Sequence, residues 1–172
     1  SNVQLGSLEA GLKEFDLAKQ NIHLDKLDLS NTKAAVEIGK QETAEVLSKK
    51  AEPIADSASA GWRFHLGALR LTNNNIRFGN AAQPRQTTGM DYAHLAINKL
   101  SLAAGALHYT KDSLSGVISN GSFEEQSGFV LNKLQTSFAY TDHGASLRDL
   151  LLQTPGTTIR KTIQLNYPSI AS

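Results

Sequence analysis

The stretch Phe64-His-Leu-Gly-Ala-Leu-Arg-Leu-Thr-Asn-Asn-Asn-Ile-Arg-Phe78 decides the fold, because three other parts of the chain are variants of it. The variants occupy residues 22–38, 95–109 and 129–140, and the last of them is the weakest match. In the shared frame, each copy begins with an apolar residue, then any residue, then Leu or Ile. Two small or polar residues follow, and after them come Leu, any residue and usually Leu. A turn and a short run of alternating apolar residues follow. The chain therefore carries four copies of one structural unit.

Alternation within the frame predicts a strand with one apolar face. Side chains on a strand point to opposite faces in turn, so Phe64 and Leu66 share one face, and Leu69 and Leu71 share one face. The two pairs are out of phase, because Leu66 and Leu69 are an odd number of residues apart. A one-residue bulge at Gly67-Ala68 would bring all four to a common face. The corresponding dipeptides in the other copies are Asp25-Lys26, Asn98-Lys99 and Asn132-Lys133.

The three asparagines at 73–75 suggest a tight turn, since Asn tolerates a positive φ angle. Each copy is therefore predicted to be a bulged strand, a turn and a return strand. An amphipathic helix is the alternative, because Leu66 and Leu69 have a helical spacing. Apolar pairs two residues apart argue against it, since such residues point to well-separated sides of a helix.

The composition excludes several classes of protein. The 172 residues make one domain or a slice of a longer array, and the opening Ser1-Asn2 is consistent with an excised fragment. A formal net charge of +1 without a basic block gives no reason to expect a nucleic-acid partner. The absence of Cys excludes disulfides and thiolate metal sites. No run reaches the roughly 20 apolar residues that a membrane helix needs.

The rest of the chain also favours strands joined by loops. Residues 3–19 predict one long strand or a hairpin with a bend near Gly11, with a helix as the competitor. Residues 40–60 are a compositional break, expected to be a loop or short-helix excursion. Residues 81–90 are expected to form a loop. The pair Asn120-Gly121 is interpreted as a reversal.

Two further turns complete a predicted meander. The segment at 141–144 reads as a tight turn of the Asp/Gly type, and residues 145–153 and 157–167 form a final hairpin around Thr154-Pro155-Gly156. The sum is an all-β fold, an elongated antiparallel meander of about ten strands in a single domain. A closed β-sandwich predicts the same alternation.

The sequence offers little chemistry for catalysis or metal binding. The five histidines are isolated in the sequence, which makes a histidine metal site an unfavoured hypothesis. Glu124 and Glu125 adjoin on opposite faces of a strand, so they are not expected to form a catalytic dyad. No phosphate loop, nucleophile elbow or dinucleotide fingerprint is present. We expect neither an enzyme nor a cofactor. Trp62 could stack on a sugar, although a lone aromatic at a strand start is more often a core or rim residue.

The four copies, together with the segments at 89–97, 127–131 and 149–159, resemble the AsmA-like superfamily. More narrowly, they resemble the TamB-type translocation and assembly module proteins of Gram-negative envelopes, in the variety found in Bacteroidetes. The resemblance covers most of the chain apart from residues 40–60, and it rests on degenerate apolar patterns. The family's membrane anchor and carboxy-terminal domain are not in this sequence, which places it within a longer protein.

The resemblance implies a taco-like periplasmic β-structure with an apolar groove, in a parent protein anchored in the inner membrane. Family members are thought to carry phospholipid between the inner and outer membranes, or to aid outer-membrane biogenesis with an Omp85-type partner. It implies no catalytic residue. Adjacent repeats of the parent would pair with both sheet edges. The expected groove lining is Ile22, Leu24, Leu27, Leu29, Phe64, Leu66, Leu69, Leu71, Ile76, Phe78, Leu95, Ile97, Leu100, Leu102, Phe129, Leu131, Leu134 and Phe138.

Two other hypotheses remain open on the sequence. The same leucines could form the closed core of a sandwich that binds a glycan or a protein through the loops at 81–90 and 40–60. The segment could also be a structural spacer.

Overall fold

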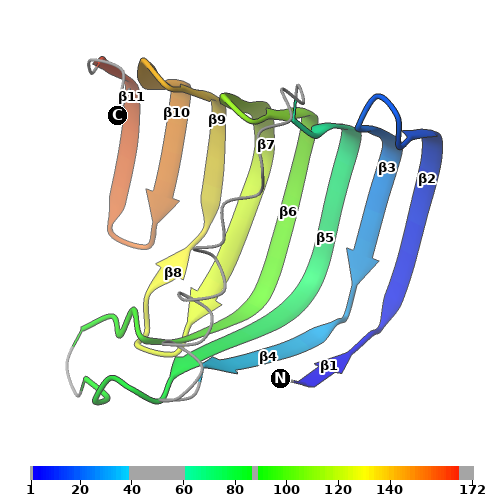
Figure 1. Cartoon of the computed structure of the whole chain (residues 1–172). Helices are drawn as coiled ribbons and strands as arrows, with labels where there is room; N and C mark the ends of the chain where they lie inside the picture. The colour runs from blue at the N-terminus through cyan, green and yellow to red at the C-terminus, as the bar shows by residue number, and fades with distance from the viewer. Residues whose placement is uncertain (1, 39–60, 87–88, 167–172) are drawn as a thin grey trace.

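The computed structural model describes residues 2–38, 61–86 and 89–166, and these form one open sheet of eleven strands (Figure 1). The described residues contain no helix, and the predicted all-β class is confirmed. The strands are β1 (Asn2–Gln4), β2 (Ser7–Asp16), β3 (Asn21–Ser30), β4 (Lys33–Ile38), β5 (Arg63–Asn80), β6 (His94–Thr110), β7 (Ser113–Glu125), β8 (Val130–Leu131), β9 (Lys133–Thr141), β10 (Gly144–Thr154) and β11 (Thr157–Asn166).

Strand order follows the chain over most of the sheet. From β5 through β6, β7, β9 and β10 to β11, each strand lies antiparallel to the next, as a meander requires. In contrast, β3 and β4 both lie parallel to β5. The chain leaves β4 at Ile38 and enters β5 at Arg63, whose backbone N–H donates to the carbonyl oxygen of Gln20 at 2.8 Å. Parallel neighbours need a long connection of this kind, and the excursion predicted at 40–60 lies outside the described residues.

The repeated unit is a single bent strand, so the predicted return strands are wrong. Residues 73–75 lie inside β5, which continues in the same direction to Asn80. Likewise, β6 runs unbroken through the third copy, and Asn120-Gly121 lies inside β7 instead of forming a reversal. In the first copy, β3 and β4 are two parts of one path along β5. The asparagines bend the backbone without reversing it.

The amino-terminal segment forms strands, as predicted, but its break is at Leu5-Gly6 and not near Gly11. β2 runs through Gly11 with a shift of register beside it. A Cβ atom on Gly6 would lie 2.2 Å from the carbonyl oxygen of Ser30. Only glycine permits this close approach of two backbones.

The irregularity predicted at Gly67 is present. In the pairing of β5 with β3 and with β6, Leu66 and Ala68 are paired, and Gly67 between them is skipped. The facing residues Asp25 on β3 and Ala106 on β6 are omitted as well, and Ala106 has a φ of 49°. The three strands therefore change phase together, and Leu66 and Leu69 can share one face.

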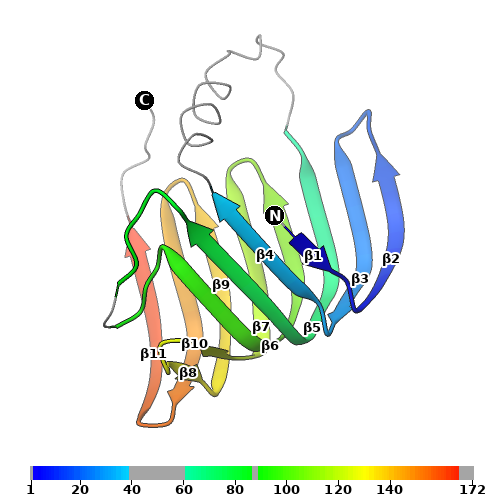
Figure 2. The same ribbon diagram turned by 90° about the horizontal axis from the view of Figure 1, so that it is seen from below.

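A corner crosses the sheet at the asparagines. Asn31, Asn73 and Lys99 have φ angles of 52°, 52° and 53° on three successive paths, and the long strands bend there (Figure 1). Seen from below, β1, β4 and the adjoining ends of β5 and β6 lie side by side beyond the corner (Figure 2). Asn is among the few residues that adopt this conformation at modest cost.

The inside of the corner is marked by two buried polar residues. Asn74 is 2% exposed and Thr32 is 5% exposed. Asn74 accepts a hydrogen bond from the Thr32 backbone N–H at 2.9 Å and donates from its amide nitrogen to the carbonyl oxygen of Leu29 at 3.0 Å. On the opposite face Asn73 and Asn31 are exposed, and their amide groups are hydrogen-bonded to each other at 2.9 Å. The face that carries Asn74 is therefore the inner face of the bend.

Candidate functional site

The inner face carries four rows of mainly apolar side chains that cross the sheet from strand to strand. We name each row after its member on β5. In the Phe64 row, each member is the register partner of the next, from β2 to β11. The row spans roughly 34 Å of sheet, since neighbouring strands lie about 4.8 Å apart. The row consists of Phe15, Ile22, Phe64, Tyr109, Leu114, Tyr140, Ala145 and Leu165.

The next three rows repeat this pattern towards the corner. The Leu66 row is Leu12, Leu24, Leu66, Leu107, Gly116, Phe138, Leu147 and Ile163. The Leu69 row is Ala10, Leu27, Leu69, Ala104, Ile118 and Thr136. The Leu71 row is Leu8, Leu29, Leu71, Leu102, Gly121, Leu134, Leu152 and Ile159. We call these four rows together the inner apolar face.

Two glycines on β7 leave space on the inner apolar face for the large side chains of the neighbouring strands. A Cβ atom on Gly116 would lie 2.4 Å from Cδ2 of Leu107 and 3.0 Å from Cζ of Phe138. At Gly121 it would lie 3.3 Å from Cβ of Leu134 and 3.4 Å from Cδ1 of Leu102. The large side chains of β6 and β9 thus meet over the backbone of β7.

The same face continues past the corner. Gly121 and Glu125 are four residues apart on β7 and share a face, and they pair with Leu102 and Ile97 on β6. Two shorter rows follow from this register. They are Val3, Ala34, Ile76 and Ile97, and then Val36, Phe78 and Leu95.

The inner apolar face has no second layer among the described residues. Among all the described residues, the only buried apolar side chains are Leu66, Ala96, Leu131 and Leu150, at 3–8% exposure, and of these only Leu66 belongs to the rows. Members at the sheet margins are far more open, such as Leu12 at 63% and Leu165 at 59%. A closed sandwich of this size would bury most of its large apolar residues. The described sheet is instead open, with an apolar inner face.

The predicted lining residues separate into three groups. Eleven belong to the four rows: Ile22, Leu24, Leu27, Leu29, Phe64, Leu66, Leu69, Leu71, Leu102, Leu134 and Phe138. Five lie at or past the corner: Leu100, which pairs with Asn74, and Ile76, Phe78, Leu95 and Ile97. The remaining two belong to no row: Leu131 is buried on β8, and Phe129 precedes it with its ring 5.9 Å from that of Phe123.

Sequence reasoning missed the members of the rows on β2, β10 and β11, and also Leu107 and Tyr109 on β6, Leu114 and Ile118 on β7 and Tyr140 on β9. Leu8, Ala10 and Leu12 alternate within β2, and Ile159, Ile163 and Leu165 do so within β11. The period of two was the available signal. The strands β2, β10 and β11 lack the repeated frame, so they were not assigned to the lining.

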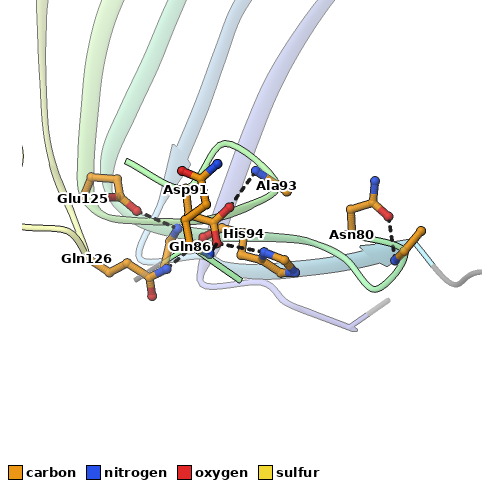
Figure 3. Close-up of polar contacts among 9 residues, drawn as sticks. Asn80, Gln86, Asp91, Ala93, His94, Glu125 and Gln126 are labelled. Carbon is orange, nitrogen blue, oxygen red and sulfur yellow. Dashed lines mark hydrogen bonds and ion pairs between the residues drawn. The ribbon is translucent and has the colours of Figure 1, made fainter. Parts of the chain in front are cut away.

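Two buried carboxylates organise the loops beyond the corner (Figure 3). Asp91 accepts hydrogen bonds from the backbone N–H groups of Gln86 and Ala93 at 2.9 and 3.1 Å, and its Oδ2 lies 2.9 Å from Nδ1 of His94. The bond from Gln86, followed by those from His94 and Ala93, outweighs burial and lowers the pKa of Asp91. Its hydrogen-bonding capacity is used by its own loop.

Glu125 has the same kind of role at the end of β7. It is 4% exposed and accepts hydrogen bonds from the backbone N–H groups of Ala96 at 3.2 Å and Ser127 at 2.7 Å. Burial by itself would raise the pKa of Glu125, but the bonds from Ser127, Ala96 and Gln126 outweigh it and lower the pKa. Beside it, the Gln126 side chain donates to the carbonyl oxygen of His94 at 2.8 Å. These contacts hold the backbone of the neighbouring segments in place.

The outer face is polar, and its histidines are not isolated in space. His23, His65 and His108 pair with one another across β3, β5 and β6. In the described ranges 2–38, 61–86 and 89–166, no group of three or more His, Cys, Asp or Glu has the arrangement of a metal site. The same ranges contain no helix that is long and apolar enough to cross a membrane.

Comparisons with models of known families, with curated proteins and with solved structures found no match for this chain. The similarity to the AsmA-like superfamily therefore rests on the sequence motifs alone.

Proposed function

We propose that the inner apolar face binds the acyl chains of phospholipid, and that the chain is a segment of a longer envelope protein that carries lipid between membranes. The observation that carries the proposal is the set of four rows, which cross an open sheet without a covering layer among the described residues. Moving one methylene group from water onto such a surface is worth about 0.8 kcal/mol. An acyl chain supplies many methylene groups in a line.

The polar groups on the inner apolar face favour a non-selective surface. Away from the Phe64 row, its polar side chains are Thr136 and, at the open margin, Lys161, which shares a face of β11 with Ile159 and Ile163. The Thr136 hydroxyl lies 3.0 Å from the carbonyl oxygen of Arg148 and 3.1 Å from that of Ser137. That hydroxyl is occupied within the sheet. Specific small-molecule sites add a few well-placed polar groups to an apolar wall, and their scarcity here suits chains that differ only in length and unsaturation.

The two sheet margins support a place within a longer structure. Among the described strands, β2 and β11 each have one neighbour, and all ten residues of β11 are exposed. A long uncovered edge strand readily pairs with another strand. We propose that adjacent repeats of the parent occupy both margins, in a periplasmic protein that is anchored in the inner membrane and acts with an Omp85-type partner.

Photocrosslinking in the full-length parent tests the acyl-chain proposal. A photoreactive residue placed at Leu69 or Leu100 is expected to capture phospholipid, and the same residue at Arg70, next to Leu69 on the outer face, is the matched control. Capture from Arg70 alone, or equal capture from all three positions, contradicts the proposal.

Two other functions give different results. A glycan-binding module predicts glycan binding that is lost on Trp62→Ala, since that side chain is 42% exposed at the start of β5. A structural spacer predicts that Asp substitutions along the inner apolar face weaken folding without affecting transport.

A further inference from the structure

The outer face carries a line of three imidazoles at the end of the sheet farthest from the corner. His65 lies between His23 and His108, with ring centroids 4.3 Å and 4.2 Å away. The contact with His23 is edge-to-face at 86°, whereas His65 and His108 approach through their nitrogens, with Nδ1 to Nδ1 at 3.0 Å. Only the second pair therefore brings two nitrogen atoms into direct contact.

That distance matches two ligands of one metal ion. Imidazole nitrogens bind divalent transition metals at about 2.0–2.1 Å, so two of them at right angles around one ion lie about 2.9 Å apart. A tetragonal arrangement of nitrogen and oxygen ligands is typical of Cu²⁺, which also binds most tightly among the divalent metals of the first row.

The surroundings leave room for an ion and its water ligands. A depression of about 380 Å³ lies over the pair, and its wall includes Glu14. His65 is partly shielded and His108 is exposed, so solvent reaches the site. The backbones of β5 and β6 hold the two rings in register, which reduces the ordering that binding requires.

The charges that face the pair are balanced. Lys13 lies 3.6 Å from Asp25, and Lys19 lies 3.2 Å from Asp16, so these cations have anionic partners. Glu14 on β2 and Arg63 on β5 are both in the wall of the depression and offset each other. On the far side, β7 presents the uncharged Ser115 opposite His108.

We propose that Nδ1 of His65 and Nδ1 of His108 form a two-histidine binding site for a divalent transition metal, with Cu²⁺ the preferred ion and water completing its coordination. Both rings bind as neutral imidazoles with their protons on Nε2, so binding replaces the contact between the two nitrogens. His23 is a neighbour of the site and not a ligand.

Titration of the whole chain with CuCl₂ at pH 7.5, in a buffer that does not bind copper, tests this assignment. We expect saturable binding of one ion and an electron paramagnetic resonance spectrum with two equivalent imidazole nitrogens. His65→Asn or His108→Asn should each weaken binding by at least about tenfold, since even the outer partners of metal ligands contribute 10–100-fold. His143→Asn, an exposed histidine at the β9–β10 turn, is the matched control and should change affinity less than twofold.

Two further results decide the ligand set. His23→Asn should change affinity less than about threefold, and a loss equal to that of His65→Asn overturns the two-ligand assignment. In the unmodified chain, sub-stoichiometric Cu²⁺ should broaden the ring resonances of His65 and His108 before that of His143, a test that needs no variant. Equal broadening of all histidines, or binding indifferent to both Asn substitutions, overturns the site.

Discussion

The two faces of this sheet share one backbone and differ in how well water solvates their side chains. On β5, His65 and Leu66 are neighbours on opposite faces. The outer face has exposed ion pairs such as Lys99 with Glu124 at 2.8 Å, and water solvates what remains. The inner apolar face continues to open margins with no described layer above it. Water solvates the outer face, whereas we propose that an apolar partner covers the inner one.

The largest effect is expected at the corner, where the inner face is most enclosed. Asn74→Ala removes the acceptor for the Thr32 N–H, in a buried hydrogen bond, and the donor to the Leu29 carbonyl, in a partly buried one. Each unsatisfied buried group costs about 1–3 kcal/mol, so the free energy of unfolding should fall by about 3 kcal/mol in urea denaturation. Asn73→Gly, which removes only an exposed contact and keeps the φ angle accessible, should cost below about 1 kcal/mol. Equal losses would contradict the distinction between the two sides of the corner.

The next largest effect separates the faces within one strand. Leu66 is 3% exposed at the centre of its row, so Leu66→Ala should lower the free energy of unfolding by about 2–3 kcal/mol. Arg70→Ala, on the outer face of the same strand, should change it by at most about 0.5 kcal/mol. Thermal and urea denaturation of the two variants measure the contrast. A larger loss for Arg70→Ala would reverse the assignment of faces.

Acid should lower the stability of the fold by protonating the buried carboxylates of the loops and not by changing the apolar rows. The pKa values of Asp91 and Glu125 are lowered in the folded chain, so they contribute stability that is fully present above their unfolded values of about 3.9 and 4.3. That contribution is lost as the pH falls through the lower folded values. Stability measured from pH 6 to pH 2 should therefore fall most steeply below about pH 4, and less steeply in Asp91→Asn and Glu125→Gln. An unchanged slope in both variants would exclude this role.

The smallest effect is expected from the exposed ion pairs of the outer face. Lys26 pairs with Glu9 across β2 and β3, and the pair is largely open to solvent. Lys26→Ala should leave the free energy of unfolding nearly unchanged, and any difference should shrink in 0.5 M salt. A larger loss that salt does not affect would show that packing of the lysine stem matters more than its charge.

The sequence predicted the strands well because period-two alternation depends on local geometry. The phase change at Gly67 was predicted for the same reason, since Leu66 and Leu69 cannot share a face without it. The path after the asparagines was not predicted correctly. A positive φ at Asn73 is compatible with both a bend and a reversal, and the choice depends on partners far away in sequence, such as Thr32 and Ser101.

Long-range pairing also explains what was missed at the candidate sites. The parallel pairing of β3 with β5 aligns His23 with His65, and nothing within either segment fixes that register. The same pairing aligns Leu24 with Leu66 and so builds the rows. Alternation predicted which residues share a face of a strand, but only the register of the sheet assembles strands into a surface.

Quenching by brominated phospholipid is the most direct test of the inner apolar face as a lipid-binding surface. In a Trp62→Phe background, Leu69→Trp places the single fluorophore on the inner face and Arg70→Trp places it on the outer face. Phospholipid with brominated acyl chains should quench the fluorescence of the Leu69→Trp variant strongly and leave that of the Arg70→Trp variant nearly unchanged. Equal quenching of both variants, or none in either, would contradict the account.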